Sequence, residues 1–366
     1  MPLARRNLFQ NPLRFLLSAA VVALSIMLML VLNGFLSGVD QQARAYLDRV
    51  PGSLVVTPPE VTNFMGQSTL LPAGAYEKAS QVAGVGRVVP VLDQVFIVDL
   101  GGTKTALFVL GYDPALGGGP WQLKQGRLPQ AENEIVLDYA LAQQRDIVIG
   151  DKLQVGGREF AISGLSGGTN TWVGAYLFMP KQVLEKLVLA PGASSYLFVT
   201  PAAGMAAEEL RDPLSSATGG TAMLKDELVE SDSRLLKGIY GPPLQLMIGI
   251  AFLVGTLVMG LVIFTATAER QREYGVLKAI GARNSLLYQV VAGQAVISAG
   301  AGLVVGIVLS FGVAWLITEL RPAITIAIEP GGVVLALTAG LVMALLAALF
   351  PARNVAQLAP AEVFRR

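Results

Sequence analysis

The chain contains no cysteine and no histidine. The first absence excludes disulfide bonds, cysteine metal sites and lipidated cysteines. The second excludes His-based zinc sites and the Ser-His-Asp and Cys-His catalytic arrangements. Charge is scarce as well, because only 14% of the 366 residues are Asp, Glu, Lys or Arg while 53% are hydrophobic. Soluble domains are about a quarter charged, so the composition indicates a membrane protein. The net charge of +1 gives no reason to expect a nucleic-acid partner.

Four long stretches of the sequence contain no Asp, Glu, Lys or Arg. A helix that spans a membrane needs about 20 apolar residues, and each stretch is long enough. The first is longer than the apolar core of a signal peptide, so we expect it to be retained. The second stretch, residues 238–268, contains Gly241, Pro242 and Pro243, which we expect to break or kink the helix that runs into this stretch from the preceding segment. The predicted transmembrane helices are 15–39, 243–268, 284–318 and 330–352.

Lys and Arg residues beside these helices indicate the orientation of the chain. They gather at the N-terminus, between the second and third helices, and at the C-terminus (Arg5, Arg6, Arg14, Arg270, Arg272, Lys278, Arg283, Arg353, Arg365 and Arg366). Cytoplasmic segments carry such an excess, so we expect the amphipathic N-terminal segment 1–14, the loop 269–283 and the tail 353–366 to be cytoplasmic. The segment 40–237 and the turn 319–329 would then lie on the outer side.

The segment 40–237 is typical of a folded α+β domain. Runs rich in Val, Ile and aromatic residues predict strands at 53–57, 87–100, 104–112, 151–165, 176–180 and 194–200, the fourth being a hairpin that turns at Gly156-Gly157. Helices are expected near 72–83, 138–145, 181–188, 204–211 and 222–238. The predicted fold is therefore four transmembrane α-helices with a large extracytoplasmic α+β domain between the first and the second.

The predicted spans lack the groups that drive ion-coupled transport. Transporters and pumps usually carry ionisable residues inside the membrane, and intramembrane proteases need a His, an Asp pair or a metal motif there. The chain also has no Gly-Lys dipeptide followed by Ser or Thr, so it has no Walker A loop for nucleotide phosphates. We therefore assign no catalytic, cofactor-binding or metal-binding residue to this chain. An ATPase, if one supplies the energy, must be another subunit.

Two pairs of glycines in the spans are four residues apart, namely Gly34 with Gly38 and Gly302 with Gly306. Such spacing lets two helices approach closely. One interpretation is a dimer interface formed with a second copy of the chain. The alternative is packing within one chain, or no role, and the spacing does not separate these possibilities.

The stretch "ERQREYGVLKAIGARN", residues 269–284, interrupts two apolar runs. Residues 271–281 can form a short helix in which Val276, Leu277 and Ile280 share one face, and Gly281 fits a helix C-terminus. An amphipathic helix at this position either lies on the bilayer or docks in a groove of a soluble protein. A third interpretation is that its charges only fix the topology. Composition does not separate the three.

The longer stretch "ERQREYGVLKAIGARNSLLYQVVAGQAVISAGAGLVVGIVLS" resembles the signature segment of FtsX/MacB-type ABC transporter permeases, the type VII or mechanotransmission family. The segment "ARRNLFQNPLRFLLSAAVVALSI" is similar to the N-terminal region of that family, and "FPARNVAQLAPAEVFRR" is similar to its C-terminal ending. One departure is Gln294, where the family often has Glu. The matching positions of the signature are Glu269, Arg270, Arg272, Glu273, Gly275, Leu277, Lys278, Ala279, Ile280, Gly281 and Ala282.

The resemblance implies a function for the charged segment. In such permeases two chains pair in the membrane, as a homodimer or with a related permease, and a dimer of ABC ATPase subunits binds ATP and Mg beneath them. The outer domain then moves to export or extract a lipid, lipoprotein, peptide or drug-like substrate, in some systems with a periplasmic adaptor. The implied location is the bacterial inner membrane, in contact with membrane lipid. The residues implied to couple with the ATPase are Glu273, Tyr274, Gly275, Val276, Leu277, Lys278, Ala279, Ile280, Gly281 and Ala282.

Two other functions remain open at this point. Some members of the same family transport nothing and use ATP-driven motion to switch on cell-wall hydrolases outside the membrane. A passive membrane anchor with no ATPase is the third possibility. Identification of a retained hydrolase, or of no ATPase at all, would distinguish these from export.

Overall fold

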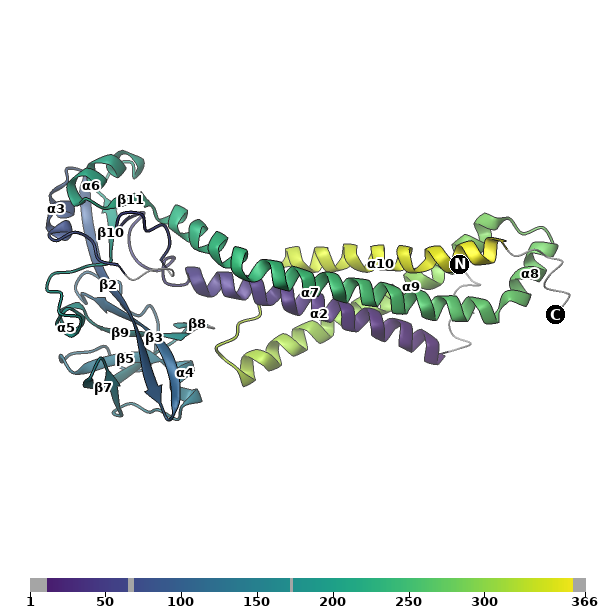
Figure 1. Ribbon diagram of the computed structural model, residues 1–366, viewed down its shortest axis with the longest axis horizontal. Helices are drawn as coiled ribbons and strands as arrows, with labels where there is room; N and C mark the ends of the chain where they lie inside the picture. Colours follow the sequence, from purple (N-terminus) through teal and green to yellow (C-terminus); the bar gives the residue numbers. More distant parts are fainter. Residues whose placement is uncertain (1–11, 65–68, 172–173, 358–366) are drawn as a thin grey trace. The chain divides into compact units, whose positions relative to one another are not determined.

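The computed structural model describes residues 12–64, 69–171 and 174–357 (Figure 1). These residues divide into two compact units. The helical unit holds residues 12–37, 240–320 and 326–357, and the outer unit holds residues 38–239 and 321–325. Most of the predicted segments 1–14 and 353–366 lies outside the described residues, so those two predictions remain as they stand.

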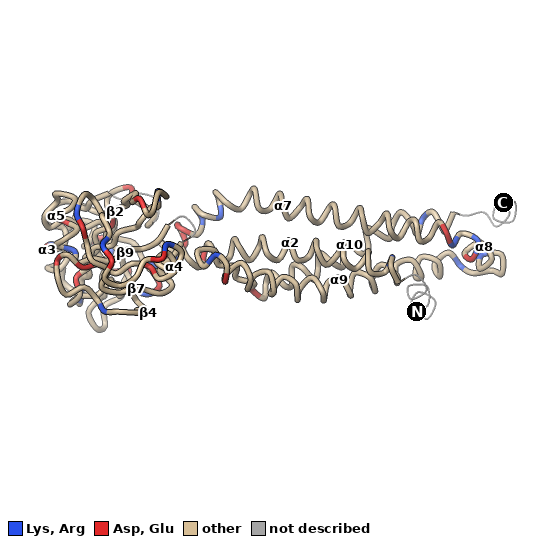
Figure 2. The backbone as a smooth tube through the Cα atoms, turned by 90° about the horizontal axis from the view of Figure 1, so that it is seen from below, with Lys and Arg blue, Asp and Glu red and all other residues tan. Residues whose placement is uncertain are grey.

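Four long apolar helices are present, as the sequence predicts, and each is long enough to cross a membrane. They are α2 (Pro12–Arg44), α7 (Lys225–Glu269), α9 (Asn284–Leu320) and α10 (Pro330–Gln357), and the short helix α8 (Gln271–Ala279) connects α7 to α9. Charged residues gather towards the ends of these helices and are absent from their middle parts (Figure 2). Apolar side chains that face away from the other helices, such as Leu253, Leu257 and Leu261, are exposed and suited to contact with lipid.

Small and aliphatic side chains form the core of the helical unit. Val22 and Ile26 of α2 pack with Met259 of α7, Ala295 of α9 and Met343 of α10, and all five are fully buried or nearly so. Alanine is frequent in this core, which allows the helices to approach closely. The unit is therefore held together by close packing of apolar side chains.

Helix α7 passes through Pro242 and Pro243 without interruption. The expected break at these prolines is therefore absent, and the helix that begins at Lys225 continues into the predicted transmembrane helix 243–268. Each proline lacks the N–H that would bond the carbonyl four residues earlier. Those carbonyls belong to Gly238 and Ile239, both of which are exposed, so water can satisfy them.

The outer unit is built on an 11-stranded mixed sheet with the order β11-β1-β10-β2-β3-β9-β5-β7-β4, to which β6 and β8 add by pairing with β7 and β9. The strands are β1 (Leu54–Thr57), β2 (Val85–Leu100), β3 (Thr103–Tyr112), β4 (Leu123–Gly126), β5 (Glu134–Asp138), β6 (Lys152–Val155), β7 (Arg158–Ser166), β8 (Asn170–Thr171), β9 (Gly174–Pro180), β10 (Tyr196–Pro201) and β11 (Thr221–Leu224). The helices are α3 (Ala75–Gln81), α4 (Tyr139–Gln144), α5 (Lys181–Leu187), η1 (Glu208–Leu210) and α6 (Arg211–Thr218).

The long strand β2 joins two lobes of this unit. Its first part pairs with β10, with Val89 opposite Phe198, and its second part pairs with β3, with Val95 opposite Phe108. Helices α3 and α6 cover the lobe that contains β1 and β10, and α4 and α5 cover the lobe that contains β5, β7 and β9. A third core contains Tyr46, Leu47 and Val50, which directly follow α2, together with Leu228 and Val229 in the first turns of α7, so the beginning of α7 is packed into the outer unit.

The predicted strands of this unit are confirmed, including the β6–β7 hairpin, where Gly156 and Gly157 have φ of +56° and +81°. Two helix predictions are displaced. The helix expected at 204–211 is the short η1 followed by α6, and the first residues of the helix expected at 222–238 form β11. The fold class itself, four apolar helices with a large α/β domain between the first and the second, is confirmed.

Candidate functional site

Helix α8 occupies most of the charged stretch that the sequence singles out. It follows α7 after Arg270, whose φ and ψ of −100° and 15° are not helical, and it ends at Ala279, with Ile280 as its C-cap. Gly281 then has a φ of +96°, a conformation that glycine adopts without strain. The N–H of Gly281 bonds the carbonyl of Lys278, and that of Ala282 bonds the carbonyl of Leu277. The chain thus turns sharply before α9.

The apolar side chains of α8 point in two directions. Tyr274 is 3% exposed and packs with Leu277 against Leu287 and Val290 of α9. Val276 and Ile280, in contrast, are 47% and 76% exposed. The expectation that Val276, Leu277 and Ile280 share a face is therefore wrong for Leu277. One face fixes α8 to α9, and the other presents an exposed apolar patch, which we call the α8 patch and define by Val276, Ala279 and Ile280.

Polar residues of α8 add two contacts within the helical unit. The Lys278 ammonium donates a 2.6 Å hydrogen bond to the carbonyl of Ala356 near the end of α10. Glu273 lies 3.7 Å from Arg270, and its side chain is largely exposed. Gly275 is buried, and Ala282 is half-buried. The ten residues that the sequence assigns to ATPase coupling therefore lie together, on α8 and the turn that follows it.

An ion pair that the sequence did not predict joins the ends of two long helices. Arg14, near the start of α2, donates two hydrogen bonds of 2.5 and 2.6 Å to the carboxylate of Glu269, the last residue of α7. The sequence analysis treats Arg14 only as a topology signal and Glu269 as part of the family signature. No local signal connects residues 255 positions apart in the chain.

The four glycines of the predicted dimer interface contact other parts of the same chain. A Cβ on Gly302 would lie 2.5 Å from the Ala19 carbonyl of α2, and one on Gly306 would lie 2.7 Å from the Ala23 carbonyl. Gly34 and Gly38 lie against residues 325–327 in the same way. These contacts account for the spacing by packing within one chain. A dimer interface at these glycines stays a prediction that their contacts do not support.

A polar cluster connects α2 with α7 inside the outer unit. Arg44 donates hydrogen bonds of 2.9 Å to Asp40 and 2.8 Å to Ser233, and the Ser233 hydroxyl donates to Asp40. Lys237 lies 3.7 Å from the same carboxylate. We call these four residues the stalk cluster. It ties the end of α2 to the beginning of α7, so the two helices are linked where they enter the outer unit.

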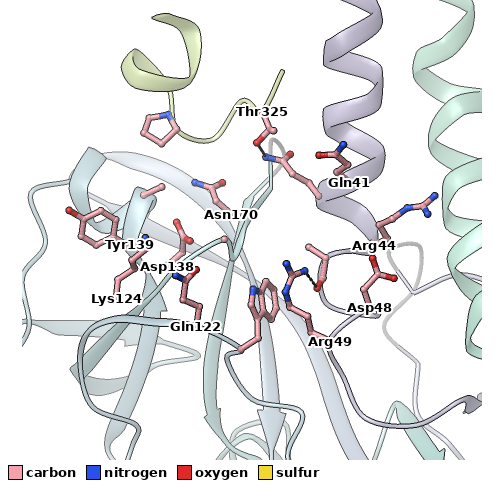
Figure 3. Close-up of a pocket in the computed structure, with 17 residues that line it drawn as sticks. Gln41, Arg44, Asp48, Arg49, Gln122, Lys124, Asp138, Tyr139, Asn170 and Thr325 are labelled. Carbon is pink, nitrogen blue, oxygen red and sulfur yellow. Dashed lines mark hydrogen bonds between the residues drawn. The ribbon is translucent and has the colours of Figure 1, made fainter. Parts of the chain in front are cut away.

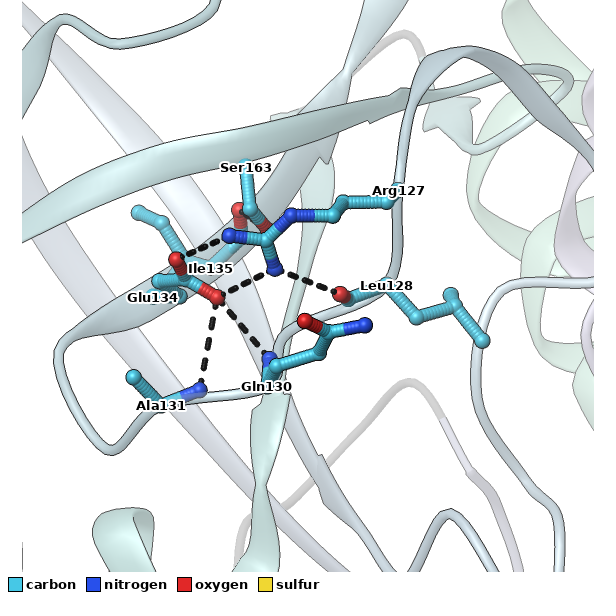
Figure 4. A network of polar contacts seen from close by, with 7 residues as sticks. All are labelled: Arg127, Leu128, Gln130, Ala131, Glu134, Ile135 and Ser163. Atoms are coloured by element: carbon cyan, nitrogen blue, oxygen red, sulfur yellow. Dashed lines mark hydrogen bonds and ion pairs between the residues drawn. The ribbon is translucent and has the colours of Figure 1, made fainter.

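A second polar network stabilises the loop that precedes β5 (Figure 4). Arg127 pairs with both oxygens of Glu134, at 2.7 and 2.5 Å, and the backbone N–H groups of Gln130 and Ala131 donate to the same carboxylate. The hydrogen bonds from Arg127 and from the backbone lower the pKa of Glu134 to about 2. This carboxylate therefore stays ionised well into the acid range.

A cavity of about 780 Å³ opens in the outer unit, between the end of α2 and the edge formed by α4 and β8 (Figure 3). Trp121 lies at its side, half-buried against Tyr176 and Phe178, with the guanidinium of Arg49 5.3 Å from its ring centre. Asp138 is a buried residue of its lining. Burial raises the pKa of this carboxyl, which accepts hydrogen bonds from the N–H of Leu141 and the hydroxyl of Thr169. In the parts of the chain that the structure describes, no group of three or more Asp or Glu residues is placed to hold a metal ion.

Comparison with known proteins gives matches over most of the chain. Residues 15–217 match the family described as MacB-like periplasmic core domain, and residues 246–360 match the family described as FtsX-like permease C-terminal. The chain is 24% identical over 365 residues to an uncharacterised ABC transporter permease of Mycobacterium tuberculosis, covering 99% of this chain and 98% of the other.

Two further matches cover smaller parts of the chain. The chain is 30% identical over 117 residues to the macrolide export ATP-binding/permease protein MacB of Agrobacterium fabrum, covering 32% of this chain and 18% of that protein. The crystal structure of the periplasmic region of MacB from Actinobacillus actinomycetemcomitans aligns at 16% identity with a TM-score of 0.38, over 50% of this chain and 92% of that one.

Proposed function

Because the chain belongs to the MacB/FtsX family of ABC transporter permeases, we propose that it couples ATP hydrolysis by a separate ATPase subunit to movements of its outer unit. The single observation that carries this proposal is the α8 patch. Val276 and Ile280 are bulky apolar side chains that remain exposed on a short helix fixed to α9 by its other face. A rigid helix with an apolar face is suited to a groove on a protein partner.

The contacts around α8 suit the transmission of force. Tyr274 and Leu277 attach the helix to α9, and the bond from Lys278 attaches it to the end of α10. The Arg14–Glu269 pair connects α2 to α7 one residue before the non-helical Arg270. A push on α8 would therefore act on all four long helices, and α2 and α7 continue into the outer unit, where the stalk cluster links them.

The composition of the spans supports force transmission over conduction. The apolar run of each helix has no Asp, Glu, Lys or Arg, so no charged side chain is available to bind an ion within it. Substrate would instead be engaged on the outer side of the membrane by the outer unit. A second copy of the chain or a related permease, with both termini in the cytoplasm of a bacterial cell, completes the proposed assembly. A lipid, lipoprotein, peptide or drug-like molecule is the proposed substrate class.

The test replaces one side chain of the α8 patch in the full-length protein. Ile280→Asp places a charge in the proposed apolar contact and should abolish co-purification of an ABC ATPase from the native membrane. Ile280→Leu keeps the patch apolar and should retain the ATPase. Both variants should insert and purify like the wild type because Ile280 is 76% exposed. Recovery of the ATPase with Ile280→Asp at the wild-type level would show that the patch is not the contact.

A further inference from the structure

The cavity shown in Figure 3 has the size of a ligand site. Its volume of about 780 Å³ falls within the range of about 300–1,000 Å³ found for small-molecule sites. Its lining comes from segments that are far apart in the sequence, namely the end of α2, residues 121–124, residues 138–140, residues 167–170 and residues 322–325. All of these belong to the outer unit.

Two cationic side chains line this cavity without a carboxylate partner. Among the residues that the structure describes, neither Arg49 nor Lys124 has an acidic group within salt-bridge distance. Arg49 donates one 2.9 Å bond to the carbonyl of Ala45 and lies over Trp121, which positions its guanidinium and leaves further donors. The methylene chain of Lys124 lies against Gly167, where a Cβ would approach to 2.7 Å. Gly167 thus gives Lys124 room at the cavity wall.

The other charged groups of the lining do not cancel these two cations. Asp138 already accepts bonds from Leu141 and Thr169, at 2.8 and 2.7 Å. Arg44 is held by Asp40 and Ser233 of the stalk cluster. Neither Asp48 nor Asp138 has a salt bridge among the described residues, but Asp138 is buried, so the exposed part of the lining holds one acid, Asp48, and the two cations Arg49 and Lys124. The amides of Gln122 and Asn170 add neutral donors at the same cavity. Arg and Lys donors supported by amides form a typical site for a phosphate group.

Two parts of the cavity lining follow predicted transmembrane helices closely in the sequence. Helix α2 continues from its apolar run, which ends at residue 39, directly to the lining residues Gln41 and Gln42. A helix rises about 1.5 Å per residue, so these amides lie only a few ångströms beyond the apolar run. Gln42 also donates 3.0 Å bonds to the carbonyl of Ala323 and the hydroxyl of Thr325, in the turn between α9 and α10. The lining thus includes residues that come directly after the predicted transmembrane helices 15–39 and 284–318 in the chain.

We propose that this cavity binds the phosphate-bearing head group of a lipid or lipid-linked molecule from the outer leaflet of the membrane. The phosphate would contact Arg49 and Lys124, and the acyl chains would remain in the bilayer. The inference rests on the proposed function in one respect, because it takes the bound lipid to be the substrate that the permease moves. It deepens that function by replacing a broad choice of substrates with an anionic lipid.

Binding can be measured on the full-length protein purified in a phosphate-free maltoside detergent. The probes are dihexanoyl phosphatidylglycerol, the matching dihexanoylglycerol without phosphate, and inorganic phosphate. We expect phosphatidylglycerol to bind at least about tenfold more tightly than either of the others. Dihexanoylglycerol lacks the phosphate, and inorganic phosphate lacks the lipid part. Equal binding of dihexanoylglycerol would overturn the phosphate contact. Equal binding of inorganic phosphate would overturn the lipid as its source.

Variants connect this binding to the named side chains. Lys124→Gln and Arg49→Gln together should weaken phosphatidylglycerol binding about tenfold or more, and Lys124→Glu alone, at an exposed position, should weaken it to a similar extent. Lys104→Gln removes an exposed cation of the same unit outside the cavity and should leave binding unchanged. Wild-type binding by Lys124→Glu would overturn the proposal. The assay contains no ATPase, so loss of the ATPase partner would contradict the proposed function without affecting this result.

Discussion

Arg14 and Glu269 join the first and second long helices by a two-pronged ion pair, with nitrogen–oxygen distances of 2.5 and 2.6 Å. Both side chains are well exposed, at 35% and 57%. Exposed pairs contribute little to stability, because water and salt screen them. The geometry is nevertheless specific, since a guanidinium and a carboxylate meet in one orientation. We therefore expect this pair to set the relative position of α2 and α7 and to matter for coupling more than for folding.

Reversal of the charges tests this role. Glu269→Arg should lower the ATP hydrolysis of the permease–ATPase complex, because it replaces attraction to Arg14 by repulsion. The double variant Arg14→Glu with Glu269→Arg restores an opposite pair and should recover much of the activity. The thermal unfolding midpoint of both variants should stay close to that of the wild type. Equal hydrolysis by the single variant and the wild type would show that the pair has no part in coupling.

The turn after α8 provides a second prediction. Gly281 has a φ of +96°, and the space around its Cα is open, so backbone conformation is the main constraint on the side chain. Gly281→Val should destabilise this turn by about 1–2 kcal/mol and reduce ATPase stimulation, because β-branched residues avoid positive φ. Gly281→Asn should be much closer to the wild type, since Asn tolerates that conformation better. If Val and Asn behave alike in unfolding and hydrolysis assays, the turn does not depend on glycine.

Two glycines in α9 form a matched pair for testing the packing of the helical unit. Gly302 faces the backbone of α2, whereas a Cβ on Gly300 would meet no atom within 4 Å. Gly302→Ala should destabilise the protein by about 1–3 kcal/mol through overpacking. Gly300→Ala should be neutral or stabilising by up to about 1 kcal/mol, because alanine favours helix. The measurement is thermal unfolding in detergent, and a stable Gly302→Ala variant would contradict the close approach of α9 to α2.

The network in Figure 4 predicts a defined dependence on pH. The pKa of Glu134 is lowered to about 2, so its contribution to stability is present above the pKa of the unfolded chain and is lost as the pH falls through about 2. Glu134→Gln should therefore cost roughly 1 kcal/mol at pH 7, allowing for screening of a partly exposed pair, and progressively less as the pH falls from about 4 to 2. The check is chemical unfolding of the full chain at several pH values.

The outer unit also contains a carboxylate, Glu159, that serves as a control for the Glu134→Gln experiment. Glu159 pairs with Lys152 at 3.1 Å, but both side chains are largely exposed. Glu159→Gln should therefore change stability little at any of these pH values. A constant cost of Glu134→Gln from pH 7 to pH 2 would mean that the charge of Glu134 is not what stabilises the loop.

The sequence is sufficient to predict features that depend on local pattern. Four uncharged apolar runs correspond to four long helices, and the Gly156-Gly157 pair corresponds to a hairpin turn, because hydropathy and positive φ are local properties. Strand β5 is harder to recognise. Its Glu134–Asp138 segment is a short buried run directly followed by helix α4, and periodicity cannot assign such a run to strand or helix. Strand β4 is exposed throughout and exists because β7 offers it an edge.

In the candidate site too, local features can be predicted from the sequence and tertiary contacts cannot. The α8 segment and its glycine end can be recognised from the chain alone, whereas the partition of its apolar residues depends on where α9 lies. Leu277 turns towards Leu287 and Val290, and this leaves Val276 and Ile280 exposed. The Arg14–Glu269 pair and the cavity lining join residues that only the tertiary fold brings together.

The central claim is that ATP binding to a partner subunit moves the outer unit relative to the helical unit. The absence of cysteine allows two labels to be introduced without removing native thiols, at the exposed positions Lys104→Cys in the outer unit and Leu320→Cys at the end of α9. Distances between spin labels at these positions can be measured in the membrane-reconstituted complex with its ATPase. We predict that the distance distribution shifts on ATP binding and returns after hydrolysis. An unchanged distribution in a complex that hydrolyses ATP would contradict the account.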